Sequence, residues 1–293
     1  MRCVLALVIT LAGCGRWGFA QPLDASAGDE GTDAVAEIAL DADTDAEAPK
    51  PDAAPMADAA PMPDSPAGMG MYSVAATTVP YTPLAGGTAV PGFVVPADDD
   101  SYALALPFTF TFYGIMYSSV NISANGYVTF EAPVTGAEAM MNDCPLDGTA
   151  PGATIAVFWD DLYASAAVMP FGTLTYAVTG TAPNRRLTIE WRDFDAFYLA
   201  GSGNNAFTQG VRITQSLALR EDNVIEMHYG PRTPPSAASK DCGADRHRGC
   251  SATVGLEASG STLFTPVQCG TALGPGPGYA PIDEGKHLVF TPS

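Results

Sequence analysis

The stretch YALALPFTFTFYG, residues 102–114, determines the predicted fold of this chain. Within it, Phe108, Phe110 and Phe112 alternate with two threonines. Because successive side chains of a β-strand point to opposite faces, this period of two places three aromatic rings on one face. The stretch therefore predicts a half-buried strand whose phenylalanines face a hydrophobic core.

The residues around this strand continue the same pattern. Val120 and Ile122 precede Asn125-Gly126, and a second apolar run, Tyr127–Phe130, follows that pair. Asn-Gly between two such runs is a strong signal for a β-hairpin. Further strand-like segments lie at 154–163, 172–180, 185–198, 207–221, 223–230, 252–259 and 285–292.

Eight to eleven strands of this kind predict a single all-β domain over residues 69–293. No segment after residue 69 shows a strong helical period, so we expect an antiparallel β-sandwich, jelly-roll-like in its connections. Leu187, Ile189 and Trp191 share one face of their strand and are expected in the core, as is Trp159. Arg186, Thr188, Glu190 and Arg192 are expected on the opposite, outward face.

The first residues of the chain predict an export signal. Arg2 is followed by a short apolar run, and residues 11–14 spell Leu-Ala-Gly-Cys, which resembles the lipobox of bacterial lipoproteins. That resemblance implies a signal peptide over residues 1–13, with cleavage before Cys14 and a lipid on its thiol. The alternative is an ordinary secretory signal that is cut after Ala20 and discards Cys14. The chain is thus expected to be exported and anchored at the outer membrane or cell surface.

Residues 14–68 are expected to form the lipidated N-terminus and a disordered acidic tether. Between residues 21 and 68 there are nine Asp and three Glu but only one Lys, many Ala and Pro, and no aromatic residue. Such a segment cannot bury enough apolar surface to fold, and its like charges keep it extended. The formal net charge of −19 for the whole chain argues against nucleic acid as a partner.

Four cysteines follow the tether, and an even number in an exported domain predicts disulfides. Four cysteines allow three connectivities; Cys242 and Cys250 flank a short loop and are the expected local pair, which leaves Cys144 with Cys269. The alternative is a metal site that includes His247, although the close cysteine spacing of zinc sites is absent.

Several segments together resemble a bacterial extracellular domain, found notably in myxobacteria, that is similar to the nidogen-like domain. They are LPFTFTFYGIMYSSVNISANGYVTF, ATIAVFWDDL, APNRRLTIEWRDF and NVIEMHYG, and the resemblance covers roughly Val74 to Pro292. It implies an all-β extracellular module without known catalysis, often associated with adhesion. Its hallmarks here are Phe112–Gly114, Asn125-Gly126, Trp159–Asp161 and Asn184–Arg186.

Carboxylates and aromatic residues supply the candidate sites. Asp160 and Asp161 end a strand and are candidate Ca²⁺ ligands, since Ca²⁺ takes six to eight oxygens, or else solvated turn residues. The same pair could serve a secreted glycan-active hydrolase, although no catalytic motif is present. Phe197 and Tyr198, in a Gly/Ser/Asn-rich loop, are the candidate ligand-binding residues.

The sequence thus predicts a non-enzymatic, surface-anchored module with no resident cofactor other than a possible Ca²⁺ ion. Its expected partners are the membrane, through the lipid, and a cell-surface protein or polysaccharide. A secreted hydrolase and a structural component of the cell envelope are the alternatives.

The mass of the intact protein, extracted from membranes, tests the anchor. We expect a chain that begins at Cys14, carries acyl groups, and has lost two hydrogens for each disulfide formed among its four remaining cysteines. A chain that begins at Gln21 without lipid would contradict this prediction.

Overall fold

The structure is a computed structural model, and it describes part of the chain. The described residues are 71–136, 139–142, 151–166, 169–196, 211–235, 242, 245–260, 263–271, 274–275 and 279–293. All of them belong to one compact unit, Pro61–Ser293. The predicted signal peptide, Cys14 and most of the tether lie outside the described residues.

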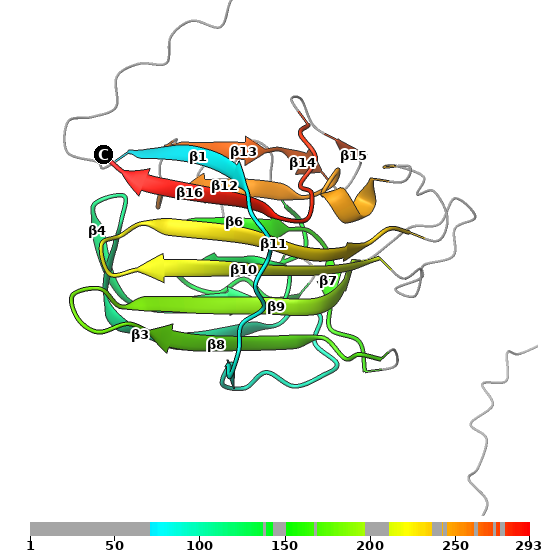
Figure 1. The fold of residues 1–293 in the computed structure, drawn as a ribbon, viewed down its shortest axis with the longest axis horizontal. Coiled ribbons are helices and arrows are strands. Elements are labelled where there is room, and N and C mark those ends of the chain that lie inside the picture. The colour runs from blue at the N-terminus through cyan, green and yellow to red at the C-terminus, as the bar shows by residue number, and fades with distance from the viewer. Residues whose placement is uncertain are drawn as a thin grey trace, which may run out of the picture. The chain divides into compact units, whose positions relative to one another are not determined.

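The larger of the two main sheets has eight antiparallel strands, and it faces the viewer in Figure 1. β7 (Leu162–Tyr163) pairs with β9 beside the main path of the sheet. Along that path the order is β1 (Tyr72–Thr78), β16 (Lys286–Pro292), β11 (Ile225–Thr233), β10 (Arg212–Arg220), β9 (Arg186–Ala196), β8 (Thr173–Thr179) and β2 (Thr88–Ala89).

The smaller main sheet has six antiparallel strands and packs behind the first. Its order is β13 (Phe264–Gln268), β12 (Thr253–Glu257), β6 (Thr154–Trp159), β5 (Tyr127–Thr129), β4 (Ile115–Ser123) and β3 (Ser101–Phe112). A separate pair, β14 (Gly270–Thr271) with β15 (Gly274–Pro275), lies beside these sheets.

The predicted antiparallel sandwich is confirmed. Phe108, Phe110 and Phe112 are buried in one core between the sheets, together with Ile189 and Trp191 from the opposite sheet. The alternating pattern therefore identified the inward faces correctly. The connections differ in detail from a jelly roll, because most neighbouring strands are consecutive in the sequence, as in two meanders.

The number of strands exceeds the eight to eleven that we predict from the sequence. The described residues contain sixteen, of which five have only two or three residues. Except for β5, which belongs to the predicted run Tyr127–Phe130, these strands have two residues each and leave no run long enough for a period of two to be recognised.

Trp159 is buried, but it faces away from the main core. It packs with Tyr127 and Ala156 in a small separate cluster on the other face of the six-stranded sheet, and its indole N–H donates to the Ala139 carbonyl oxygen at 2.9 Å. The expectation that it lines the main core is therefore wrong in its choice of face. The cause is a local irregularity: the Gly126 carbonyl accepts from both Val157 N and Phe158 N, which shifts the phase of the strand end.

The outward face of the eight-stranded sheet is also partly covered. The segment after β1 crosses it as a strap (Figure 1), and Glu190 beneath it is fully buried. The Glu190 carboxylate accepts from the Tyr81 hydroxyl at 2.6 Å and from Leu84 N at 2.8 Å, and pairs with Arg192 at 2.5 Å. Glu190 lies on the predicted face, but it is not exposed there.

The described part of the chain contains no α-helix, and its 3₁₀ segment η2 (Arg246–Arg248) is only three residues long. No described helix has the length and apolar character needed to cross a bilayer.

Candidate functional site

The chain passes from the six-stranded to the eight-stranded sheet at Asp160-Asp161. β6 ends at Trp159 in one sheet and β7 begins at Leu162 in the other, so two acidic residues form the whole connection. Asp160 is buried and Asp161 is half-buried, so an unpaired charge would be costly, most of all at Asp160. Their partners therefore decide what this corner can do.

Asn125-Gly126, the pair that predicts a hairpin, is docked onto this corner. Asn125 is fully buried, and its side-chain oxygen accepts from Leu162 N at 2.8 Å while its backbone oxygen accepts from Asp160 N at 3.3 Å. Gly126 has a φ of 78°, and a Cβ there would lie 2.3 Å from the Phe158 carbonyl oxygen. Only glycine fits this close approach.

The hairpin between β4 and β5 is thus confirmed, but Asn125-Gly126 does not form a simple two-residue turn. The last paired residues are Ile122 and Val128, so five residues form the connection. The longer loop allows Asn125 to reach into the interior and satisfy backbone groups of the neighbouring corner.

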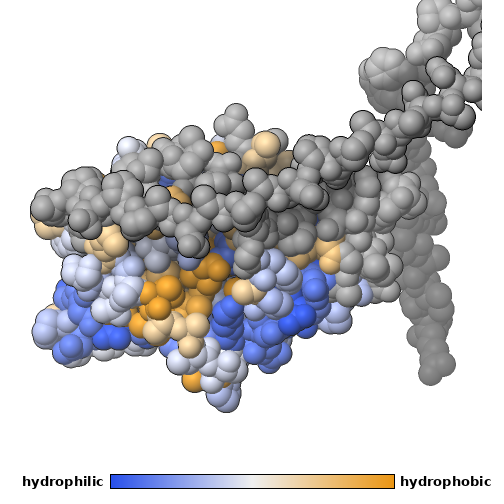
Figure 2. All heavy atoms as spheres, turned by 90° about the horizontal axis from the view of Figure 1, so that it is seen from above, coloured by the Kyte–Doolittle hydropathy of each residue, from blue (hydrophilic) through white to orange (hydrophobic). Residues whose placement is uncertain are grey.

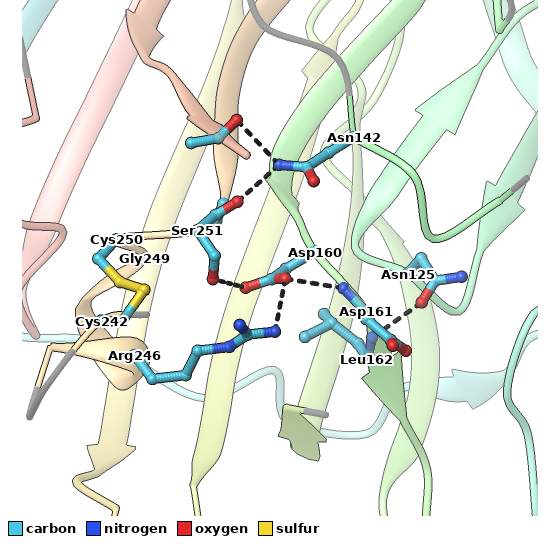
Figure 3. A network of polar contacts seen from close by, with 12 residues as sticks. Asn125, Asn142, Asp160, Asp161, Leu162, Cys242, Arg246, Gly249, Cys250 and Ser251 are labelled. Atoms are coloured by element: carbon cyan, nitrogen blue, oxygen red, sulfur yellow. Dashed lines mark hydrogen bonds and ion pairs between the residues drawn. A yellow bond between two sulfur atoms is a disulfide. The ribbon is translucent and has the colours of Figure 1, made fainter. Parts of the chain in front are cut away.

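Asp160 lies in a buried ion pair (Figure 3). It is 2% exposed, and its Oδ1 lies 3.0 Å from Nη2 of Arg246, which is itself 7% exposed. Its Oδ2 accepts from the Ser251 hydroxyl at 2.7 Å, and Oδ1 also accepts from Asp161 N at 2.9 Å. Both carboxylate oxygens are therefore engaged by groups of the chain itself.

Arg246 is held in place by the loop that carries it. The predicted Cys242–Cys250 disulfide is present, with its Cα atoms 5.9 Å apart, and it closes the loop that contains η2. Asn142 supports Ser251, the residue after Cys250, because its Nδ2 donates to the Ser251 carbonyl oxygen at 2.6 Å. Disulfide, helix and ion pair thus form one continuous structure (Figure 3).

The second predicted disulfide is tested only in part. Cys269 is disulfide-bonded, whereas Cys144 lies outside the described residues, so their pairing stays a prediction.

Asp161 has a different environment from Asp160. Its carboxylate points away from the Asp160–Arg246 pair in Figure 3. Burial, together with the charges of Asp160, Asp98 and Asp99, raises the pKa of Asp161 to about 7, and Arg246 only partly offsets this effect. Burial beside Asp99 and Asp100 raises the pKa of Asp98 in the same way.

The acidic run Asp98–Asp100 lies close to the corner. Ala97, just before it, bridges Ala164, and the Asn125 side chain donates to Asp99 Oδ1 at 2.9 Å. Acids from two distant segments thus lie near one another. Among the described residues, no group of three or more His, Cys, Asp or Glu side chains is arranged to hold a metal ion.

These contacts bear on the two chemical hypotheses for Asp160 and Asp161. To ligate Ca²⁺ or to act in hydrolysis, Asp160 would first have to leave Arg246 and Ser251. The ion pair thus gives Asp160 a structural explanation. Calcium binding and hydrolysis at this pair stay predictions that the geometry does not favour. Phe197 and Tyr198, the candidate binding residues, lie outside the described residues.

The remaining hallmark residues also serve the scaffold. Tyr113 and Gly114 have φ values of 46° and 82° and form the tight turn between β3 and β4. Arg185 pairs with Glu221 at 2.6 Å, donates to the Pro107 carbonyl oxygen, and lies over the Phe108 ring. It therefore ties the β8–β9 and β10–β11 turns to the opposite sheet.

The sequence could not reveal the partner of Asp160. Arg246 is 86 residues away and lies in a polar loop without strand periodicity. The available signal is its position inside the Cys242–Cys250 loop, which predicts a rigid local structure but not the direction in which it points.

Comparison with known proteins gives one match. A protein-family model described as "NIDO related" matches residues 71–273, more than half of the chain and most of the sandwich. No curated protein matches the chain, and neither does any solved structure.

Removal of the Asp160 carboxylate tests its structural role. We expect Asp160→Ala to lower the free energy of unfolding by about 3–5 kcal/mol, because Arg246 is left buried without its counter-charge. Asp222→Ala is the matched control: it breaks an exposed ion pair with Arg220 and should cost less than about 1 kcal/mol. Urea denaturation at neutral pH measures both, and equal losses would contradict the prediction.

Asp161 predicts a specific pH dependence of stability. Its pKa is higher in the folded chain than in the unfolded chain, so the folded state is stabilised below the ordinary pKa and loses that contribution as the pH rises through about 7. Asp161→Asn should therefore raise the free energy of unfolding at pH 8, by about 2–4 kcal/mol, and change it little near pH 4.

Asp100→Asn, which neutralises an exposed residue of the same acidic run, is the control for this experiment. A pH-independent effect of Asp161→Asn would show that its charge is not the cause.

Proposed function

Because the chain belongs to the NIDO-related family, we propose that it is a non-catalytic extracellular module that binds a ligand at the cell surface. In this proposal a bacterial lipoprotein signal directs export, and acyl groups on Cys14 hold the protein at the outer membrane or cell surface. The acidic segment of residues 21–68 spaces the sandwich from the bilayer.

One observation supports the non-catalytic part of the proposal: Asp160, an acid of the hallmark motif Trp159–Asp161, is neutralised inside the protein. Asp160 is buried and paired with Arg246 and Ser251, so it has no free oxygen to offer a substrate. A general acid or a nucleophile has to reach the reacting atoms of its substrate. The buried position of Asp160 supports a structural role instead.

The other hallmark residues support the same conclusion. Asn125-Gly126 fixes the corner between the sheets, and Arg185 fixes the opposite end of the sandwich. These residues hold the scaffold together. In such a scaffold, ligand recognition is expected at the loops and at the sheet edges. Phe197 and Tyr198 remain our proposed contact residues in one such loop.

Charge favours some classes of ligand over others. Beyond residue 68 the chain has 20 acidic and 10 basic residues. Described arginines other than Arg232 are paired with carboxylates inside the domain. Such a surface is suited to neutral or cationic ligands, such as a neutral polysaccharide or a basic region of a surface protein, and not to nucleic acid.

Binding of the labelled full-length protein to an array of glycans and isolated cell-surface material tests this function. We expect saturable binding that falls on the double substitution Phe197→Ala/Tyr198→Ala. Binding should be retained in Phe171→Ala, which removes an aromatic ring that is 41% exposed elsewhere in the domain. A broad glycoside panel should show no hydrolysis.

Two results would contradict the proposal. Hydrolysis that disappears in Asp161→Asn would favour the enzyme, and the absence of saturable binding to any surface component would favour a purely structural envelope protein.

A further inference from the structure

The free edges of the two main sheets are not equally protected. Natural proteins guard exposed sheet edges with proline, charge, bulges or very short strands, because an open edge accepts a further strand. β3 contains Pro107 and loses its register between Ala105 and Phe110. β13 contains Pro266, and β2 is only two residues long.

β1, the remaining terminal strand, has none of these protections. It pairs with β16 through seven consecutive residue pairs without a register shift. All of its residues from Ser73 to Thr78 are exposed, and the sequence YSVAATT contains neither proline nor charge. Figure 1 places β1 at the margin of the eight-stranded sheet.

The hydrogen bonds of β1 show which backbone groups face outward. Ser293 N donates to the Met71 oxygen at 2.8 Å, and Val79 N donates to the Gly285 oxygen at 2.8 Å, so the odd-numbered residues face β16. Groups of an antiparallel strand alternate between its two sides. The N–H and C=O groups of Val74, Ala76 and Thr78 therefore point along the free edge.

Two hollows lie beside this edge, and one acid that lines both has no ion pair among the described residues. A hollow of about 580 Å³ is lined by Ala76–Thr78, Pro281, Asp283, Glu284 and Lys286, and a second of about 420 Å³ by Thr78–Tyr81, Glu284 and Gly285. Asp283 pairs with Arg248, and Lys286 donates to the Pro281 carbonyl oxygen. Glu284 lines both hollows and forms no ion pair with the described residues.

Exposed apolar side chains lie on and just after β1. Figure 2 shows the domain from above the view of Figure 1, with an apolar area between hydrophilic ones. Val74 and Val79, at 42% and 38% exposure, are among the exposed apolar side chains of this part of the chain. An added strand could cover such side chains while it pairs with the backbone.

We propose that β1 is a docking edge for an extended segment of a partner polypeptide that carries Lys or Arg and adds to the eight-stranded sheet as a further strand. The basic side chain lies beside Glu284. This inference rests on the proposed binding function and names a partner class and a surface for it.

Charge and composition decide against the other occupants. The tether is rich in proline, which cannot donate to a ladder, and its own acids would be repelled by Glu284. A second copy of the chain would bring another acidic domain against the first, since acids outnumber basic residues two to one beyond residue 68.

Synthetic peptides provide the test with the full-length protein. The probe is Lys-Val-Thr-Val-Lys-Val-Thr, compared with a peptide that has Glu in place of Lys and with one that has Pro in place of Val. We expect saturable binding of the first peptide, at least about tenfold tighter than that of the others. Hydrogen exchange should show new protection at the amides of Val74 and Ala76.

Two variants of Ala76 and one control variant separate docking from folding. Ala76→Pro removes an outward N–H without breaking a bond to β16, so it should weaken peptide binding at least about tenfold and leave the melting temperature nearly unchanged. Ala76→Lys should weaken it as well, because a cation on the edge repels the basic peptide. Val178→Lys, which adds the same charge at an exposed position of β8 in the same sheet, should bind as the unmodified protein does.

Three outcomes would overturn the inference. They are no saturable peptide binding, equal binding of the Lys and Glu peptides, and self-association in sedimentation that Ala76→Pro abolishes. If glycans or cell-surface material still bind when the peptides fail, the edge is wrong and the proposed function stands. If the peptides bind and surface material does not, the proposed function fails and the edge remains.

Discussion

The rest of the sandwich depends on how the chain solves one problem: it must cross between two sheets in two residues without leaving buried polar groups unpaired. At Asp160-Asp161 the strand ladder of β6 has ended and that of β7 has not begun. The backbone at this point takes its partners from Asn125 and the Asp160 carboxylate takes its own from Arg246 and Ser251. Buried groups in such networks have to be satisfied together, since one missing partner costs more than the pair contributes.

This requirement explains why distant segments converge here. The loop before β5, the acidic run before β3 and the disulfide loop before β12 share no sequence pattern, yet each supplies a group to the corner. Asp161 shows the limit of the solution. Burial and the nearby carboxylates raise the pKa of Asp161. The corner therefore stabilises the ionised form of Asp160, which has Arg246 as its partner, but not that of Asp161.

The fold was predictable because its signal is local and repeated. Alternation at Phe108, Phe110 and Phe112 fixes the inward face of β3 without knowledge of any other strand, and the same holds for Leu187, Ile189 and Trp191 in β9. The Cys242–Cys250 pair was predictable for a similar reason, because the two residues are only eight apart in the sequence. What the sequence did not reveal depends on tertiary contacts. Trp159 changes face because β6 bulges at the Gly126 carbonyl oxygen, and Glu190, on its predicted face, is covered by a strap from a different part of the chain.

The candidate site was harder to predict because a carboxylate has the same appearance in a sequence whether it binds a metal, a substrate or an arginine. Asp160-Asp161 suggested calcium by residue type alone, and only the position of Arg246 distinguishes a salt bridge from a ligand set. The role of an arginine is equally hard to predict, because the sequence does not show whether it pairs with an acid or packs on an aromatic ring. Arg232 forms no ion pair with the described residues and instead lies 4.7 Å from the centroid of Phe158, where burial lowers its pKa to about 10.

The distribution of these charges also bears on recognition. Because most of the described arginines neutralise carboxylates within the domain, few cations remain to offset the acids that face solvent. The domain therefore has an acidic surface, although its arginines are engaged in stabilising ion pairs. The uncharged edge of β1 is then the place where a partner backbone can approach without desolvating an ionised side chain, which is the costliest step in forming a polar interface. The charge that attracts a basic partner and the strand that receives it are therefore separate features of one edge.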